Sequence, residues 1–185
     1  MSYMFYHCIS LTNLDLSNFN TKKVSDMSHL FQSCDLLTNL NLSNFNTQNI
    51  TDISFMFYHC ISITNLDLSN FNTKNVTNMN NMFYECNSLI NLSLSSNFNT
   101  QKYTNISSTF YQCNSLKNLN LSHFNIINVT NMSYMFYNCY KLTNLDLSNF
   151  NSQNVTSMSN MFDSYESLKK ENIITKDNRI LNFFK

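Results

Sequence analysis

Cysteine and histidine are the side chains of this 185-residue chain that could bind a metal or act as nucleophile and base. The six cysteines recur at intervals of 26 or 27 residues: Cys8, Cys34, Cys60, Cys86, Cys113 and Cys139. Zinc sites use ligand pairs only a few residues apart, and the chain contains no CxxC motif. Parallel side chains at equivalent positions also give poor disulfide geometry. We therefore predict no metal site, no cofactor and a row of buried, reduced cysteines.

The four histidines do not suggest a catalytic arrangement. His7 and His59 occupy equivalent positions two repeats apart, about 10 Å at sheet spacing, which is too far for one metal ion. His29 and His123 lie at other positions, and we expect all four to be solvated. Candidate Ser, His, Asp and Cys residues recur from unit to unit, whereas catalysis needs one unique constellation. We predict no catalytic residue, and a protein that is not an enzyme.

The cysteine spacing belongs to a repeat that covers most of the chain. Residues 11 to 34 read LTNLDLSNFNTKKVSDMSHLFQSC, and the later units copy this stretch with few changes. A fixed period of this size predicts a solenoid, in which each unit buries its apolar face against its neighbours. We assign residues 1–168 to one array of about six and a half units, with Tyr165 at the last cysteine position. Residues 169–185 form a C-terminal cap or tail.

The array starts part-way through a unit. The first residues, MSYMFYHC, match MSYMFYNC near residue 139 rather than the start of a repeat. Met4, Phe5 and Cys8 therefore occupy core positions with no unit before them. We expect an uncapped N-terminal end, and we predict self-association through it.

Each unit contains two segments with different periodicities. The first reads LxxLxLxxF, and its alternation predicts a short strand with Leu14 and Leu16 pointing inward. The second places Val24, Met27 and Phe31 at steps of three and four, which is typical of a short helical or 3-10 segment. The predicted fold is therefore an α/β solenoid with one parallel sheet of short strands and short helical or 3-10 segments on the opposite face.

Local signals refine this prediction. Ser25 and Asp26 lie where the second segment would need an N-cap. Glycine and proline are both absent, so we expect asparagine to supply the left-handed backbone at the corners. Unit four carries one extra residue in LSLSSNFNT, and we expect a small bulge at Ser95 or Ser96.

Composition excludes several classes of partner. The net charge is zero and 12% of the residues are charged, so the chain lacks the basic excess of a nucleic-acid-binding protein. No apolar run approaches the ~20 residues that cross a bilayer, which predicts no membrane insertion. The N-terminal stretch shows no signal peptide.

The repeat elements LxxLxLxxF and MFxxC resemble the repeats of BspA-like bacterial surface proteins of the leucine-rich-repeat class. The resemblance covers about residues 1–168 and implies a leucine-rich-repeat-like solenoid at the cell surface or outside the cell, with a role in adhesion or protein binding. Members of that class often carry glycine just before the cysteine, where this chain has other residues. Phenylalanine also replaces the usual asparagine of such repeats, so an aromatic spine should replace the asparagine ladder.

Two surfaces are candidates for binding a protein or glycan ligand. Outward positions of the predicted strands form a polar stripe, which is our first choice because sheet faces of solenoids are their usual contact surfaces. It comprises Asn13, Asp15, Asn39, Asn41, Asn65, Asp67, Asn91, Ser93, Asn118, Asn120, Asn144 and Asp146. A tyrosine column, which combines apolar area with hydroxyl groups, is our second choice. It comprises Tyr6, Tyr58, Tyr84, Tyr111 and Tyr137.

These observations lead to two functional hypotheses. The first is a non-enzymatic repeat protein that mediates protein or cell-surface binding. The alternative is an intracellular structural or scaffold repeat protein, including a truncated copy of a longer one.

Overall fold

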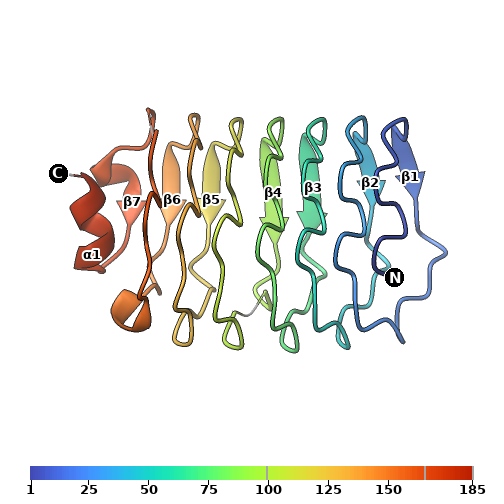
Figure 1. Ribbon diagram of the computed structural model, residues 1–185, viewed down its shortest axis with the longest axis horizontal. Helices are drawn as coiled ribbons and strands as arrows, with labels where there is room; N and C mark the ends of the chain where they lie inside the picture. The colour runs from blue at the N-terminus through green and yellow to red at the C-terminus, as the bar shows by residue number, and fades with distance from the viewer. Residues whose placement is uncertain (99, 165, 185) are drawn as a thin grey trace.

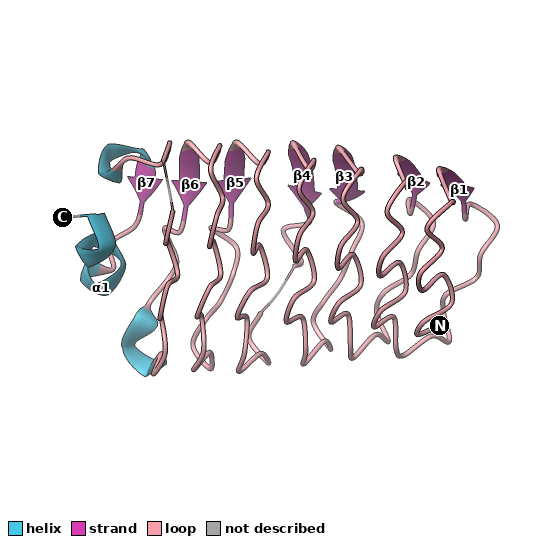
Figure 2. Cartoon of the chain, turned by 45° about the horizontal axis from the view of Figure 1, so that its top comes forward, coloured by secondary structure: helices cyan, strands magenta, loops and turns pink. Residues whose placement is uncertain are grey.

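The chain winds into an elongated stack of coils, with one repeat per coil and the termini at opposite ends (Figure 1). The computed structural model describes residues 1–98, 100–164 and 166–184. Short strands lie side by side along one face, and the helices lie toward the C-terminal end (Figure 2). The elements are β1 (Asn13–Asp15), β2 (Asn39–Asn41), β3 (Asn65–Leu68), β4 (Asn91–Leu94), β5 (Asn118–Asn120), β6 (Asn144–Asp146), η1 (Ser152–Asn154), η2 (Lys170–Asn172), β7 (Ile173–Ile174), α1 (Asn178–Leu181) and η3 (Asn182–Phe184).

The strands are parallel, as predicted, and their register matches the repeat. Asn13 pairs with Asn39, Asn65 with Asn91, and Asn118 with Asn144. Hydrogen-bonded pairing divides the described strands into β1-β2, β3-β4 and β5-β6-β7, with wider gaps between these groups in Figure 1. The expectation of one parallel sheet is therefore wrong in detail, because among the described strands β2 does not pair with β3, nor β4 with β5.

The arm opposite the sheet consists of consecutive turns, where we expected a helical or 3-10 segment. In the second coil, Cys34 N–H donates to the Phe31 carbonyl at 3.1 Å within the turn. Alternate N–H groups point along the stack instead: Phe31 N–H donates to the Met56 carbonyl of the next coil at 2.9 Å, and Ser33 N–H donates to the Tyr58 carbonyl at 2.8 Å. A helix directs its N–H groups back along its own axis and could not form this ladder between coils.

A left-handed residue in each turn produces this alternation. Two such residues occur per coil, four positions apart, with φ between 54° and 62°. Three of them are asparagines, so the prediction that asparagine supplies these conformations at the corners is wrong. The residues are Tyr3, His7, His29, Ser33, Phe55, His59, Asn81, Glu85, Ser108, Gln112, Tyr134, Asn138, Asn160 and Ser164.

The residues predicted to be N-caps form side-chain turns instead of capping a helix. Asp26 Oδ1 accepts from the Ser28 N–H at 2.8 Å and from the Ser28 hydroxyl, and Asp52 makes the same pair of bonds to Ser54. These are side-chain turns that start the arm without a helix.

Two phenylalanine columns fill the interior, and they confirm the expected aromatic spine. Phe45, Phe71, Phe98, Phe124 and Phe150 are buried after the strands, and Phe19 of the first coil is half-buried. In the turn arm, stacked rings lie 5.3 to 5.8 Å apart from Phe5 through Phe162. Leu16 is buried as predicted, and Leu14 is half-buried.

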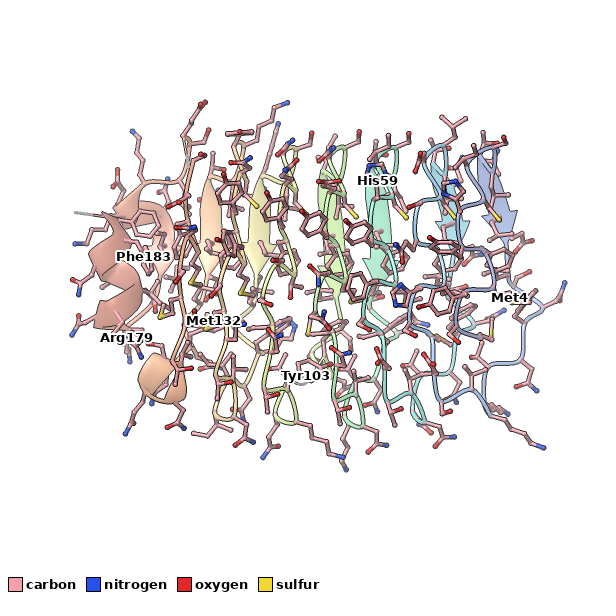
Figure 3. All side chains as sticks on the ribbon, viewed as in Figure 1. Met4, His59, Tyr103, Met132, Arg179 and Phe183 are labelled. Carbon is pink, nitrogen blue, oxygen red and sulfur yellow. The ribbon has the colours of Figure 1, made fainter. Side chains whose placement is uncertain are left out.

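The extra residue of the fourth coil is absorbed just after β4. Ser95 is buried, and its carbonyl accepts from Phe98 N–H at 2.9 Å, as the Leu16 carbonyl does from Phe19. In the same coil Tyr103 is fully buried (Figure 3), where the other coils carry valine or isoleucine.

The C-terminal segment packs on the last coil. β7 pairs with β6 through Leu145 and Ile173, so the strand column continues beyond residue 168. Phe183 and Phe184 meet Phe162 edge-on at 5.5 and 4.9 Å, and Ile180 is buried. The assignment of residues 169–185 to a C-terminal cap, and the boundary at residue 168, stay proposals.

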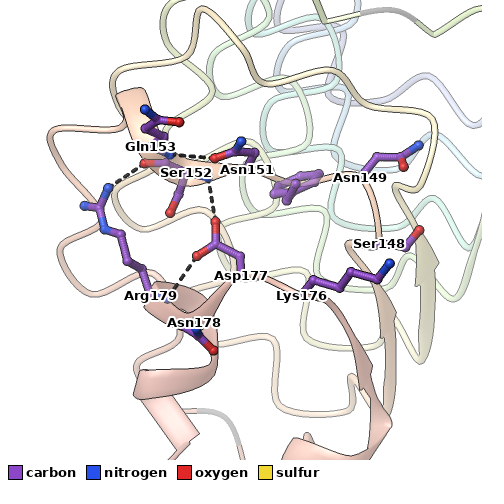
Figure 4. A pocket seen from close by; sticks show the side chains of 10 residues that line it. Ser148, Asn149, Asn151, Ser152, Gln153, Lys176, Asp177, Asn178 and Arg179 are labelled. Carbon is purple, nitrogen blue, oxygen red and sulfur yellow. Dashed lines mark hydrogen bonds between the residues drawn. The ribbon is translucent and has the colours of Figure 1, made fainter.

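Polar contacts fix the same segment to the array (Figure 4). Asp177 Oδ2 accepts from Ser152 N–H at 2.5 Å, and Arg179 Nη1 donates to the Val155 carbonyl at 2.9 Å. Asp177 thus occupies the place that the next coil would take.

The first coil exposes apolar side chains. Tyr3, Met4, Tyr6 and Ile9 are each about half exposed, between 47% and 53%. The counterparts of Met4 in the next two coils, Leu30 and Met56, are fully buried. Self-association through this face stays a prediction.

Candidate functional site

The outer face of the strands carries the polar stripe. Every residue of the Asn13 column is exposed, as predicted: Asn13, Asn39, Asn65, Asn91, Asn118 and Asn144. Within the strand pairs these amides bond to one another, with Asn91 Nδ2 donating to Asn65 Oδ1 at 2.7 Å and Asn144 donating to Asn118 at 2.7 Å. No such bond joins Asn65 to Asn39 or Asn118 to Asn91 among the described contacts, so the amide ladder breaks where the sheet breaks.

The neighbouring column, which begins with Asp15, is mostly exposed and also accepts backbone hydrogen bonds at the ends of the strands. Asp15, Asn41, Asp67 and Asn120 are exposed, Ser93 likewise, and Asp146 is half-buried. Asp15 Oδ1 accepts from Ser17 N–H at 2.9 Å, and this bond holds the pKa of Asp15 below its ordinary value. Asn41, Asp67, Asn120 and Asp146 make the equivalent bond. One oxygen of each side chain accepts this bond at the end of its strand.

Two open depressions lie along this stripe. One, of about 500 Å³, spans the first three coils between Asn13 and Asp67. The other, of about 550 Å³, spans the last coils between Leu92 and Ile174 and includes Asp146 and Glu171. The polar stripe is therefore concave at both ends of the stack.

The tyrosine column forms a stacked ridge over four coils. Tyr58, Tyr84, Tyr111 and Tyr137 lie with ring centroids 4.3 to 4.9 Å apart and planes within 7° of parallel. Burial, then the neighbouring Tyr111 and Glu85, raise the pKa of Tyr84. Tyr6 lies apart, against Tyr3 and His7, because Gln32 interrupts the column. The rings cover one another's faces, so the ridge presents ring edges and hydroxyl groups.

The cysteines form the predicted buried row. Cys34, Cys60, Cys86, Cys113 and Cys139 are buried, Cys8 is half-buried, and all six are free. Each buried thiol donates to a phenylalanine carbonyl of the preceding coil, as Cys60 does to Phe31 at 3.1 Å. Burial raises the pKa of Cys86 and of Cys139 to about 12.

Three histidines differ from the expected solvated state. His29 is stacked between Tyr3 and Phe55, with ring centroids at 4.3 and 4.6 Å. His59 lies between two carboxylates, Nδ1 at 3.2 Å from Asp35 and Nε2 at 3.5 Å from Glu85. Burial lowers the pKa of His123. The sequence repeat could have revealed the neighbours of His29, since Tyr3, His29 and Phe55 occupy the same position in successive repeats.

The described residues contain no cluster of three or more His, Cys, Asp or Glu side chains arranged for a metal. Within the same residues, no helix is both long and apolar enough to span a bilayer.

A family model matches most of the chain, over residues 1–118 and again over 62–176. Its description is "Mycoplasma protein of unknown function, DUF285". The chain belongs to this family. No curated protein matches it.

One solved structure places the fold of this DUF285 chain in the leucine-rich-repeat class, as the repeat predicted. A leucine rich cell surface protein from Faecalibacterium prausnitzii is similar with a TM-score of 0.52 and 21% identity, over 76% of this chain and 34% of that one. The T. pallidum leucine rich repeat protein has a TM-score of 0.45 and 23% identity, over 75% of this chain and 68% of that one. The DUF285 chain thus spans about a third of the length of the Faecalibacterium protein.

The position before each cysteine, where related repeats often have glycine, has a structural explanation in this chain. His7, Ser33, His59, Glu85, Gln112 and Asn138 all adopt the left-handed conformation that glycine enters without steric cost.

Proposed function

We propose that this DUF285 chain is a non-enzymatic binding module that recognises a protein or glycan at a cell surface through the outer face of β1 to β6. The observation that carries the proposal is the exposed column of six asparagines along β1 to β6, which is flanked by the mostly exposed Asp15 column and hollowed at both ends of the stack. Amides and carboxylates offer both donors and acceptors, which suits polar ligands such as peptide backbone or sugar hydroxyls. The similar Faecalibacterium protein is a cell surface protein, which supports the surface location.

Part of the face is rigid enough to bind without a large ordering cost. The strand-ending bonds orient the Asp15 column, and amide pairs orient much of the Asn13 column. At the breaks in the amide ladder, Asn65 Nδ2 donates to the Thr64 hydroxyl at 2.9 Å rather than to Asn39. Asn118 is held through Oδ1, which accepts from Asn144, and its Nδ2 makes no hydrogen bond among the described contacts.

Bulky charged substitutions on this face provide the test. We expect Asn65→Arg combined with Asn118→Arg to abolish retention of the chain on immobilised extracellular-matrix proteins or neutral oligosaccharides that bind the unmodified chain. Ser88→Arg combined with Ser115→Arg, on the edge that precedes the strands, is the matched control and should bind normally. Equal loss in both double variants, or no loss in the first, would contradict the proposed face.

A further inference from the structure

A second polar surface lies along the edge of the stack where η1 is placed, at the bottom of Figure 1. Each coil contributes a two-residue loop tip there, equivalent to Gln153 and Asn154 of η1. The tips of coils one, three and four carry the exposed lysines Lys22, Lys23, Lys74 and Lys102, and the other tips carry Gln, Asn or Ile. We call these four residues the lysine edge.

The lysine edge has no acidic counterpart. Among the described residues, the ion pairs within 4.0 Å are those of His59 with Asp35 and Glu85, so none of the four lysines is neutralised. At a coil spacing of ~4.8 Å, the charges extend over about 14 Å of the stack. A protein with zero net charge thus concentrates four of its eleven basic residues on one line.

Hydrogen bonds between coils hold the loop tips in place. Asn49 Nδ2 donates to the Lys22 carbonyl at 2.8 Å, and Asn75 Nδ2 donates to the Gln48 carbonyl at 2.8 Å. Lys102 Nζ donates to Asn75 Oδ1 at 3.2 Å. The backbone of one tip is braced by the side chain of the next, so the positions of the lysines are set before a ligand arrives.

Beside the lysine edge lies a trough lined with amides. Two adjoining depressions, of about 450 and 390 Å³, run along the first three coils and share Lys22, Asn44 and Asn46. Asn20, Asn46 and Asn72 each use Oδ1 to accept from the N–H two residues later, at 3.1 to 3.2 Å. Their Nδ2 groups make no hydrogen bond within the described part of the chain and are oriented by that turn. The trough therefore presents a column of N–H donors next to a line of ammonium groups.

We propose that the trough and the lysine edge bind an acidic polysaccharide, with its sulfate or carboxylate groups on the lysines and its hydroxyl and ring oxygens on the asparagine amides. An extended polymer suits a linear, donor-rich groove, and amide donors match the neutral oxygens that lie between its charges. This surface is separate from the outer face of the strands, so it does not depend on the function proposed above.

Binding of defined oligosaccharides to the whole chain tests the proposal. The probes are a heparin fragment for sulfate, an oligogalacturonate for carboxylate, neutral dextran, and single-stranded DNA. We expect binding to at least one acidic oligosaccharide, weakened by added salt, and none to dextran. Lys22→Gln combined with Lys74→Gln should weaken that binding about tenfold, because two charge-assisted contacts are lost. Lys117→Gln combined with Lys141→Gln, which changes the net charge equally elsewhere, should change it less than about twofold.

A second pair of variants tests the amide donors. Asn46→Asp keeps the oxygen that accepts from Gln48 N–H and replaces the donor by a negative charge, so it should weaken binding at least as much as the lysine changes. Asn131→Asp is the matched control, since Asn131 accepts from Ser133 N–H in the same way on the turn arm, where other coils already carry Asp26 and Asp52. Thermal melting confirms that all variants fold. Absence of binding to both acidic probes, equal loss in variant and control, or tighter binding of DNA through the same residues would each overturn the proposal.

Discussion

Each coil contains non-glycine residues whose backbone adopts the left-handed conformation, which is energetically unfavourable for them. A non-glycine residue in this region is disfavoured by about 1 to 2 kcal/mol. Phe55 and Tyr134 adopt it where their rings join a ridge, so packing compensates there. Gln112 has φ 56° and is half-buried, and its side chain makes no hydrogen bond among the described contacts.

We therefore predict that Gln112→Gly stabilises the protein. Relief of the backbone strain exceeds the extra entropy that glycine loses on folding, for a net gain of about 0.5 to 1 kcal/mol. Gln48→Gly, at a position without positive φ, should instead lower stability by a similar amount. Urea denaturation measures both, and a loss of stability in Gln112→Gly would show that the left-handed residue is unstrained.

Thiol reactivity reports the burial of the cysteine row. Deprotonation of Cys86 and Cys139 is suppressed because burial raises their pKa to about 12. A thiol-specific reagent at neutral pH should label at most Cys8 in the native protein, and all six cysteines in denaturant. Rapid native labelling of several cysteines would show that the coils open locally.

At the scale of the element, the strand was predictable and the turn arm was not. Alternation of Leu14 and Leu16 with polar residues identifies a strand directly, because its period is distinct. The steps of three and four between Val24, Met27 and Phe31 fit a helix. They fit a series of turns equally well, because such turns also point every third or fourth side chain inward. What excludes the helix is the ladder of hydrogen bonds to the next coil, a long-range feature that no window within one repeat contains.

The same reasoning explains which parts of the candidate site were predictable. The outward positions of the Asn13 column follow from strand alternation alone, and all six are exposed. The trough beside the lysine edge was missed because it depends on side-chain turns at Asn20 and Asn46 and on bracing between coils. The recurring pattern of asparagine two residues before each loop tip was the available signal.

The C-terminal cap should respond to pH through Asp177. Burial raises the pKa of this carboxyl, but hydrogen bonds from Ser152, Arg179 and Ile180 outweigh burial and leave it below the ordinary value. A lowered pKa means that the stabilisation is complete above the unfolded pKa of ~3.9 and is lost as pH falls through the folded value.

We expect Asp177→Asn to be less stable than the unmodified protein at pH 7, by less than about 1 kcal/mol because the group is partly exposed. The difference should shrink below about pH 4, where the native carboxyl is protonated too. Melting curves between pH 2.5 and 7 measure it. A constant difference across that range would mean that Asp177 acts through shape rather than charge.

On the scale of the whole molecule, stability depends on contacts between neighbouring coils. The long-range hydrogen bonds of the array join residues about 26 positions apart, one coil to the next. Such an array behaves as a row of coupled units, in which a weak interface can separate the two sides.

Phe71 tests this coupling because it is fully buried near the middle of the stack. Phe71→Ala removes a ring that the flanking coils cannot replace without moving, at a cost of about 3 to 5 kcal/mol. We expect calorimetry to resolve two transitions, one for each side of the lesion, rather than one transition shifted as a whole. Asn65→Ala is the control: Asn65 is exposed and accepts one amide bond from Asn91, so its loss should cost under about 1 kcal/mol. If Asn65→Ala proved as damaging as Phe71→Ala, the strand face would contribute to the fold as much as the core does, and its amides would not be available to a ligand.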